Sequence, residues 1–217
     1  MAAKSVQRSA PPTVPVAIFD LGGVLLDWNP RHLYRKLIPD PVEMEDFLAK
    51  VATTEWHAGQ DRGGDPVEAT RLLKSRHPGL EALIEAFYDR FDEMCDHGFP
   101  EMTALVERLH DAGTPLYLLS NAPGFLDAWV RGPGQRRHPF LACFREYVVS
   151  GRVGHLKPAP AIYDLVCRAG GFAPGAAVFI DDSLPNVLGA RAFGMQAIHH
   201  VSADRTIDGL RTLGLPA

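Results

Sequence analysis

Short apolar runs separated by helix-like stretches are the main pattern along this chain. Five of these runs show little alternation of polar and apolar positions, as parallel strands covered on both faces require. They are residues 14–19 (VPVAIF), 115–119 (PLYLL), 146–150 (EYVVS), 176–180 (AAVFI) and 196–201 (QAIHHV). The pattern predicts five strands of a buried parallel sheet.

Helical periodicity fills the intervals between the later runs. Residues 100–112, 160–169 and 184–193 carry apolar side chains at helical spacing. A glycine follows each stretch, and glycine readily adopts the left-handed conformation that ends a helix. Strands alternating with helices predict right-handed crossovers. The expected fold class is therefore α/β: a three-layer, Rossmann-like parallel sheet with helices on both faces.

The interval after the first strand departs from this rhythm, because it has helix patterns and no clear strand. Asp-Pro-Val-Glu occurs at residues 40–43 and 65–68, where Asp can cap a helix, Pro fits its first turn and Glu follows three residues after the cap. We therefore predict a small helical cap inserted into the core. The expected parts are a flexible tail at residues 1–13, a core at 14–30 and 97–217, and a cap at 31–96.

Composition fits a folded globular chain and narrows the range of partners. The 217 residues are 46% hydrophobic and 22% charged, and 22 Lys and Arg against 26 Asp and Glu give a net charge of −4. A mildly acidic chain without a basic stripe argues against nucleic-acid binding. No apolar run approaches the roughly 18 residues of a membrane span, so we expect no membrane partner.

The cysteines and the N-terminal sequence bear on the compartment. Cys95, Cys143 and Cys167 are widely spaced, which fits small core residues in a reducing compartment better than disulfides or a zinc site. The N-terminal segment lacks the apolar stretch of a secretory signal. We therefore expect a cytoplasmic protein and leave open whether it is a monomer or a homodimer.

Polar residues gather at the ends of the predicted strands. In an open parallel sheet, ligands bind beyond the carboxyl ends of the strands. Carboxylate oxygens there suit Mg²⁺, and a lysine with a Ser-Asn loop suits a phosphate group. The residues concerned are Asp20, then Ser120 and Asn121, then Asp181 and Asp182, with Lys157 in a loop before a helix.

Each of these residues also has an ordinary structural explanation. An Asp after a strand commonly caps a helix, and Ser-Asn and Lys-Pro are common in turns and loops. Only their joint occurrence at or beside strand ends indicates a site.

Four motifs in this order resemble the haloacid dehalogenase-like (HAD) hydrolase superfamily, in the branch with a helical cap inserted after the first strand. They are residues 17–25 (AIFDLGGVL), 118–121 (LLSN), 157–158 (KP) and 178–183 (VFIDDS). The resemblance covers nearly the whole chain from about Pro15.

The resemblance implies Asp20 as the nucleophile, which would form an aspartyl-phosphate or an aspartyl ester. A carboxylate is an effective nucleophile when a cation neutralises the reacting group. Ser120 and Asn121 would hold the transferred phosphoryl group, and Lys157 would neutralise charge on that group and on Asp20.

The resemblance also implies a Mg²⁺ ion as cofactor. Asp20, the backbone carbonyl of Gly22, Asp181 and Asp182 would hold it. Three carboxylates without a cation would repel one another, and a divalent cation resolves that conflict. The sequence leaves open which of Asp181 and Asp182 binds the metal directly.

Gly22 departs from the pattern of most phosphatases in this superfamily, which carry an acid–base Asp at that position. Glycine cannot carry a proton, so another group must assist the leaving oxygen. The candidates are Asp27 and His57. The same replacement occurs in a subset similar to sugar-phosphate phosphatases such as α-glucose-1-phosphate phosphatase.

Three functions remain open, and Mg²⁺-dependent hydrolysis of a small phosphorylated metabolite is the favoured one. A 2-haloacid dehalogenase needs no metal, and its fourth motif favours Ser and Asn over the paired acids found here. The third alternative is a catalytically weak protein that binds phosphate.

The cap is expected to determine substrate specificity. Residues 55–64 (EWHAGQDRGG) are polar, aromatic and rich in glycine. In related caps a turn at this place projects over the active site, so the resemblance implies such a loop here. Such a lining would suit a sugar phosphate, although Trp28 and Trp56 would equally fit packing between cap and core. The candidate pocket residues are Trp28, Asn29, Arg31, Trp56, His57, Gln60, Asp61 and Arg62.

Overall fold

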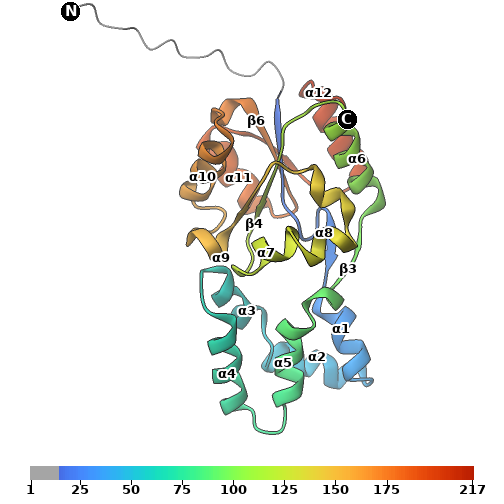
Figure 1. The fold of residues 1–217 in the computed structure, drawn as a ribbon, viewed down its shortest axis with the longest axis vertical. Coiled ribbons are helices and arrows are strands. Elements are labelled where there is room, and N and C mark those ends of the chain that lie inside the picture. Colours follow the sequence, from blue (N-terminus) through green and yellow to red (C-terminus); the bar gives the residue numbers. More distant parts are fainter. Residues whose placement is uncertain (1–14) are drawn as a thin grey trace, which may run out of the picture.

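Five parallel strands form the centre of the molecule (Figure 1). The computed structural model describes residues 15–217, so the tail expected at residues 1–13 lies outside the described residues. In spatial order the strands are β5 (Glu146–Val149), β4 (Leu116–Ser120), β1 (Val16–Phe19), β6 (Ala177–Asp181) and β7 (Gln196–His199). Each of the five predicted strands is present, which confirms the α/β fold.

Both faces of the sheet are buried, which explains why the sequence shows apolar runs instead of alternation. In β1, Ala17 and Phe19 belong to one core cluster, whereas Val16 and Ile18 belong to the other. The helices that cover the first face are α6 (Pro100–Asp111) and α12 (Ala203–Thr212), and those that cover the second are α10 (Pro160–Gly170) and α11 (Leu184–Phe193).

The register of the sheet places the strand ends side by side. Phe19 is paired with Leu118 of β4 on one side and with Ile180 of β6 on the other. Asp20, which follows Phe19, donates its backbone N–H to the Ile180 carbonyl at 2.9 Å. The end of β1 therefore lies between the ends of β4 and β6.

Short helical segments in the connections between the strands complete the core. Their helices are α7 (Leu126–Val130), α8 (Pro133–Arg137) and α9 (Ser150–Val153), and their 3₁₀ turns are η2 (Pro139–Cys143) and η3 (Pro174–Ala176).

A group of helices lies below the sheet in Figure 1, between the strands β2 (Leu26–Trp28) and β3 (Cys95–Gly98). We call this group, residues 30–93, the cap. It confirms the helical insertion expected after the first strand. Its elements are α1 (Pro30–Leu37), α2 (Pro41–Lys50), α3 (Thr54–Asp61), α4 (Pro66–Arg76), α5 (Glu81–Asp89) and the 3₁₀ turn η1 (Phe91–Glu93).

The two Asp-Pro helix starts are confirmed. Asp40 accepts hydrogen bonds from the backbone N–H groups of Val42 and Glu43, at 2.8 and 3.0 Å. Asp65 accepts one from Val67 at 2.9 Å. Each carboxylate satisfies N–H groups that have no partner within the helix.

The prediction of a loop at residues 55–64 is wrong, because most of that segment forms helix α3. Thr53 caps the helix by accepting a hydrogen bond from the Trp56 N–H at 3.1 Å. The helix buries His57 and Gln60 instead of aliphatic side chains. Its buried side is therefore polar, and the usual apolar periodicity is absent from the sequence.

The pairing of β2 with β3 was not expected from the sequence. The two strands are antiparallel and connect the core to the cap. Each is only three or four residues long and carries polar residues, so neither shows a period of two. A ribbon of this kind forms because the chain must enter and leave the cap side by side.

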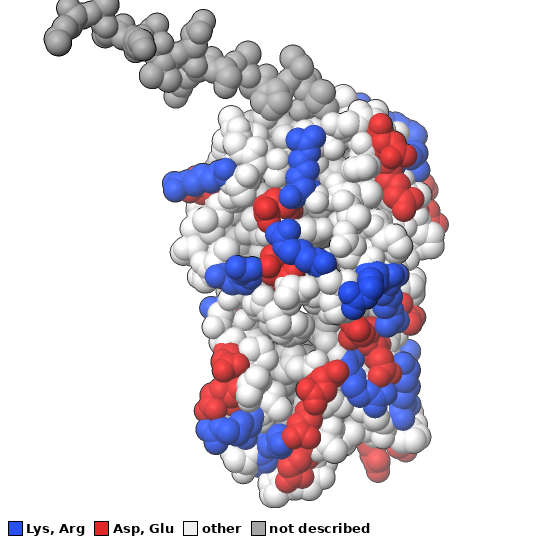
Figure 2. Space-filling view, in the orientation of Figure 1, with Lys and Arg blue, Asp and Glu red and all other residues white. Residues whose placement is uncertain are grey.

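Two surface features bear on possible partners. None of the helices within residues 15–217 is long and apolar enough to cross a membrane. On the face shown in Figure 2, positive and negative side chains are interspersed among the described residues.

Candidate active site

Lys157 connects the carboxylates that follow β1 and end β6. Its Nζ lies 2.9 Å from Oδ1 of Asp20 and 2.7 Å from Oδ2 of Asp181. It also donates to the Leu119 carbonyl at 2.9 Å. Because the Lys157 side chain is fully buried, its three N–H donors are directed to protein oxygens and not to water.

Burial and charge shift the pKa values within this cluster. Burial is the main cause that raises the pKa of Asp20 to about 7; Lys157 opposes the shift and Asp181 adds to it. Burial by itself would lower the pKa of Lys157, but the two carboxylates raise it above its ordinary value. The lysine is therefore charged at neutral pH and supplies the positive charge beside Asp20.

The contacts of Asp20 distinguish its two oxygens. Oδ1 accepts a hydrogen bond from the Leu21 N–H at 2.7 Å and pairs with Lys157. Oδ2 receives no hydrogen bond from residues 15–217. One oxygen is thus fixed by the protein, and the other is available to a ligand.

Asp181 and Asp182 differ in environment although they are adjacent in sequence. Asp181 is completely buried, and besides Lys157 its oxygens accept from the Ser183 N–H at 2.8 Å and from Asn186 Nδ2 at 3.0 and 3.1 Å. Asp182 is exposed and lines the cavity next to Asp20. Asn186 was not among the site residues expected from the sequence.

Gly23 allows Asp182 to approach the loop after β1. Its φ is +72°, in the left-handed region that favours glycine, and a Cβ placed there would lie 2.5 Å from Oδ2 of Asp182. A side chain at residue 23 would therefore displace the Asp182 carboxylate.

The donor set fits a hard divalent cation. Asp20, Asp181 and Asp182 each offer an oxygen, and these three atoms lie within 4.8 Å of one another. Lys157 supplies one positive charge against three carboxylates, so a divalent ion would offset the remaining charge. Both oxygens of Asp181 already accept hydrogen bonds, which makes Asp182 the better direct ligand.

Asn121 is occupied with the backbone of Lys157. Its Nδ2 donates to the Lys157 carbonyl at 3.0 Å, and its Oδ1 accepts from the Lys157 N–H at 2.8 Å. Ser120 and Asn121 both line the cavity beside Asp20. The role expected for them in holding a phosphoryl group stays a prediction, and Asn121 has a second role in fixing the lysine loop.

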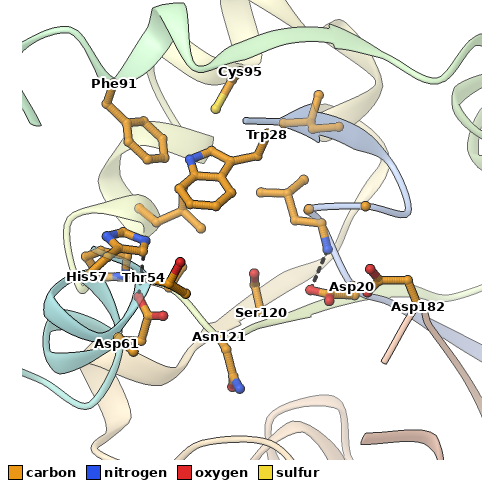
Figure 3. Close-up of a pocket in the computed structure, with 18 residues that line it drawn as sticks. Asp20, Trp28, Thr54, His57, Asp61, Phe91, Cys95, Ser120, Asn121 and Asp182 are labelled. Carbon is orange, nitrogen blue, oxygen red and sulfur yellow. Dashed lines mark hydrogen bonds and ion pairs between the residues drawn. The ribbon is translucent and has the colours of Figure 1, made fainter. Parts of the chain in front are cut away.

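A cavity of about 370 Å³ opens between the sheet edge and the cap. In Figure 3, Asp20, Ser120, Asn121 and Asp182 lie along one side of it, and Trp28, Phe91 and Cys95 lie along the opposite side. The full lining is Asp20, Leu21, Gly22, Gly23, Leu26, Trp28, Thr54, His57, Ala58, Asp61, Phe91, Cys95, Ser120, Asn121, Ala122, Pro123, Leu126 and Asp182.

A model of the haloacid dehalogenase-like hydrolase family matches residues 14–194. The chain belongs to this family. The resemblance inferred from the four motifs is therefore confirmed, and the protein is a hydrolase of the HAD type.

Two relatives of this HAD-like hydrolase are named as phosphatases. A sesquiterpene phosphatase, astK, from Aspergillus oryzae is 28% identical over 201 residues, which cover 93% of this chain and 97% of the relative. A D-ribitol-5-phosphate phosphatase from Bacteroides thetaiotaomicron is 29% identical over 186 residues, covering 82% and 88%. These relatives support a phosphatase, as expected from the sequence.

Solved HAD structures share the fold. A HAD family enzyme from Bacteroides thetaiotaomicron, in complex with magnesium and inorganic phosphate, is 23% identical and covers 85% of this chain and 93% of its own, with a TM-score of 0.63. An L-2-haloacid dehalogenase is 21% identical, with 85% of each chain covered and a TM-score of 0.61. At this level of identity the two likenesses show the fold and do not separate the two chemistries.

Only some of the residues expected in the pocket of this HAD-like hydrolase line the cavity. Trp28, on β2, and His57 and Asp61, on α3, line the cavity with Asp20. Trp28 and His57 stack on each other, with ring centroids 5.1 Å apart and planes inclined by 19°.

Trp56 and Arg31 do not line this cavity, contrary to expectation. Trp56 packs edge-on against Phe87 inside the cap, with ring centroids 5.1 Å apart. Arg31 pairs with Glu45 at 2.6 Å and lines a separate pocket behind Trp28. The other expected residues outside the cavity are Asn29, Gln60 and Arg62. Helical geometry explains Trp56: it adjoins His57 on α3, and neighbouring residues of a helix point in different directions.

Neither candidate for the missing proton carrier fits that role. Asp27 pairs with His32 at 2.9 Å and does not line the cavity. His57 lines it, but burial lowers the pKa of His57 to about 4. The His57 imidazole is therefore neutral at pH 7 and has no acidic proton to offer as an imidazolium.

Asp61 is a buried carboxyl group that sequence reasoning treated only as a pocket residue. Burial raises the pKa of Asp61 to about 6, and the neighbouring Arg62 opposes the shift. Its Oδ1 is buried and has no hydrogen-bond partner among the described residues, and His57 Nε2 lies 3.7 Å from it.

Ser150 ties the cap to the catalytic edge of this hydrolase. Its buried Oγ donates to the backbone carbonyl of Asp61, at the end of α3, at 2.7 Å. The same oxygen accepts from the Ala122 N–H at 3.0 Å, in the loop after Ser120 and Asn121. One hydroxyl group thus holds the cap helix against the loop that lines the cavity.

Proposed function

We propose that this protein is a Mg²⁺-dependent phosphatase that hydrolyses a small phosphate monoester through a phosphorylated Asp20. The observation that carries the proposal is the buried Lys157, which pairs with Asp20 and Asp181 beside the exposed Asp182. A carboxylate attacks phosphorus effectively when cations neutralise the charge on the transferred group. The names of two phosphatase relatives agree with this chemistry.

In the first step, Asp20 attacks the phosphorus atom through Oδ2, the oxygen without a hydrogen bond from the described chain. The bond between phosphorus and the ester oxygen breaks, and the leaving oxygen takes a proton from solvent water to give the alcohol. Lys157 favours the ionised form of Asp20 because its ammonium lies 2.9 Å from Oδ1. Ser120 Oγ and the second N–H of Asn121 Nδ2 bind the phosphoryl oxygens.

In the second step, water attacks the phosphorus of the aspartyl-phosphate. The bond to Asp20 breaks, inorganic phosphate leaves and the carboxylate is regenerated. Lys157 again offsets the negative charge that returns to Asp20. Gly22 offers no side chain to take the proton of the attacking water, so we expect this step to be slow compared with enzymes that have an Asp there.

Asp20, the carbonyl of Gly22 and Asp182 would hold the Mg²⁺ ion. The ion, when bound, supplies a Lewis acid that neutralises charge on the phosphoryl group. Asp181 acts through other residues, because its oxygens are engaged by Lys157, Ser183 and Asn186. Its role is to position the ammonium and the start of α11.

The cavity argues against the dehalogenase alternative. A 2-haloacid carries a carboxylate next to the carbon that is attacked, and this second charge needs a cationic partner when it is buried. None of the residues that line the described cavity is Lys or Arg. Its lining carboxylates, Asp20, Asp61 and Asp182, would repel the carboxylate of the substrate.

Three assays on the purified chain distinguish the alternatives. Phosphate release from acetyl phosphate and p-nitrophenyl phosphate should require Mg²⁺ and should vanish in Asp20→Asn. Halide release from 2-chloropropionate in excess chelator would instead identify a dehalogenase. Binding of inorganic phosphate without turnover of either ester would identify a phosphate-binding protein.

A further inference from the structure

The side of the cavity opposite Asp20 is apolar. Trp28 and Cys95, from the β2–β3 ribbon, and Phe91, at the end of the cap, form it, and the apolar side chains of Leu26 on β2 and Leu126 on α7 also line the cavity. Trp28, Phe91 and Cys95 lie together on that side in Figure 3, facing the phosphoryl end across the cavity. The alcohol part of an ester bound at Asp20 therefore extends toward apolar side chains.

No counter-charge is available there for a second anionic group. The lining contains neither Lys nor Arg, and Arg31, on the other side of Trp28, is engaged by Glu45. The polar side chains of the cap that reach the cavity are those of Thr54, His57 and Asp61. They offer a hydroxyl, an imidazole and a carboxyl group, which lie together at one side of the cavity (Figure 3). The side formed by Trp28, Phe91 and Cys95 therefore offers few hydrogen-bond partners to a substrate.

This wall discriminates between classes of alcohol. A sugar has a hydroxyl on nearly every carbon, and hydroxyls buried against Leu26, Phe91 and Leu126 would lose their hydrogen bonds to water without replacement. An alkyl, terpenoid or aryl alcohol gains free energy from the same burial.

The volume of the cavity suits a small ester. About 370 Å³ lies within the range of roughly 300–1,000 Å³ that small-molecule pockets span. The phosphate monoester of a small alcohol therefore fits between the sheet edge and the cap.

We propose that the substrate is the phosphate monoester of an uncharged, largely apolar alcohol, whose hydrocarbon part contacts Leu26, Trp28, Phe91, Cys95 and Leu126. This inference rests on the proposed phosphatase function and replaces the sugar phosphate expected from the sequence. Hydrolysis transfers the phosphoryl group to Asp20 and then to water, and releases the apolar alcohol.

The test compares esters that differ in the polarity of the alcohol. Hexyl phosphate and glucose 6-phosphate are both esters of primary alcohols with six carbons, so their comparison reports chiefly on contacts of the alcohol part. We expect kcat/KM to favour hexyl phosphate by about 100-fold, and to rise about twofold to fourfold per methylene from butyl to octyl phosphate. Equal or greater activity on glucose 6-phosphate, or no dependence on chain length, overturns the inference.

Acetyl phosphate separates this inference from the proposed function. Its acyl group is too short to reach the apolar wall, so its hydrolysis reports on Asp20 and Lys157. Hydrolysis of acetyl phosphate without a preference for alkyl esters refutes only the substrate class. No hydrolysis of any ester refutes the phosphatase proposal itself.

Two tryptophan variants test whether the preference for apolar esters arises from the wall of the cavity. Trp28→Ala should lower the ratio of octyl phosphate to acetyl phosphate activity by about tenfold, because Trp28 forms part of the apolar wall. Trp56→Phe, which changes an indole inside the cap and outside the cavity, should keep that ratio. The chain-length series on the wild-type protein decides the question if either variant fails to fold.

Discussion

Asn121 and Lys157 exchange two hydrogen bonds, from Asn121 Nδ2 to the Lys157 carbonyl at 3.0 Å and from the Lys157 N–H to Asn121 Oδ1 at 2.8 Å. The residues lie 36 positions apart, one after β4 and the other in the loop before α10. The Ser-Asn motif and the lysine motif are thus one structural unit. The side chain of Asn121 fixes the backbone from which the Lys157 ammonium reaches Asp20.

We expect Asn121→Ala to lower kcat at least tenfold and to destabilise the fold by about 1–3 kcal/mol, since two partly buried hydrogen bonds are lost. Steady-state kinetics and urea denaturation measure the two effects. The control is Gln196→Ala, at an exposed position of β7, which should change neither. Full activity in Asn121→Ala would show that the lysine loop holds its position without this contact.

Asp20→Asn should abolish turnover and leave the fold intact, because an amide is nearly isosteric but is a poor nucleophile and a poor cation ligand. Asp27→Asn is the matched control: Asp27 lies on β2 and pairs with His32 outside the cavity. It should keep activity within about threefold. Circular dichroism checks the fold of both variants, and retained activity in Asp20→Asn would reject Asp20 as the nucleophile.

Mg²⁺ should raise the Tm of the wild-type protein, because an ion that binds only the native state stabilises it. Asp182→Asn should reduce this shift strongly, since Asp182 is exposed in the cavity beside Asp20 and is the direct ligand that we propose. Excess chelator should remove activity, and Ca²⁺ should restore it poorly because it prefers more ligands at longer distances. An unchanged Tm shift in Asp182→Asn would exclude Asp182 as a ligand.

Asp61 should make stability depend on pH. Its pKa is raised to about 6 in the folded protein, so the native state holds this proton more tightly than the unfolded state. The stability that the protonated carboxyl contributes is complete below the unfolded pKa of about 4 and is lost as pH rises through about 6.

Asp61→Asn removes this dependence. Between pH 4 and pH 8, the free energy of unfolding of the variant should fall by about 1–3 kcal/mol less than that of the wild type. Denaturant titrations at several pH values measure the difference, with chelator present in both samples. The other ionisable groups facing Asp61 are His57, Arg62 and Tyr88, and they are common to both proteins. If the free energy of unfolding depended on pH equally in both proteins, the pKa of Asp61 would not be raised in the folded state. The Asp61 carboxyl group would then be in contact with water.

Gly22→Asp should restore part of the missing acid–base assistance. A Cβ at residue 22 would contact only Cβ of Trp28, at 3.8 Å, and Gly22 does not have a positive φ. We expect kcat on an alkyl phosphate to rise about tenfold or more, with a smaller effect on p-nitrophenyl phosphate, whose leaving group needs no proton.

Gly23→Asp is the matched control for that substitution. Residue 23 has a φ of +72°, and its Cβ would lie 2.5 Å from Asp182 Oδ2. This variant should therefore lose activity. A gain in Gly23→Asp, or an equal gain on both esters in Gly22→Asp, would contradict an acid–base explanation.

The sequence by itself determined the core and the meeting of the catalytic motifs. Continuous apolar runs required strands buried on both faces, and such strands lie parallel with their carboxyl ends at one edge. Asp20, Ser120 and Asp181 therefore had to lie near one another, whatever their separation in sequence. The two Asp-Pro helix starts were equally local, because a cap depends on residues within one turn.

Only the tertiary structure determined the structure of the cap and the separate roles of the residues within the site. Helix α3 buries His57 and Gln60 against distant residues, so its polar sequence by itself predicts a loop. Burial also moved the pKa of His57 to about 4 and that of Asp61 to about 6. Asp181 and Asp182 are adjacent residues of the same type, so the sequence does not distinguish their roles. Contacts with Lys157 and Asn186 engage the oxygens of Asp181 and make it a positioning residue. Local patterns fix strands and caps, whereas burial, pKa and the direction of a side chain depend on neighbours that the fold alone brings together.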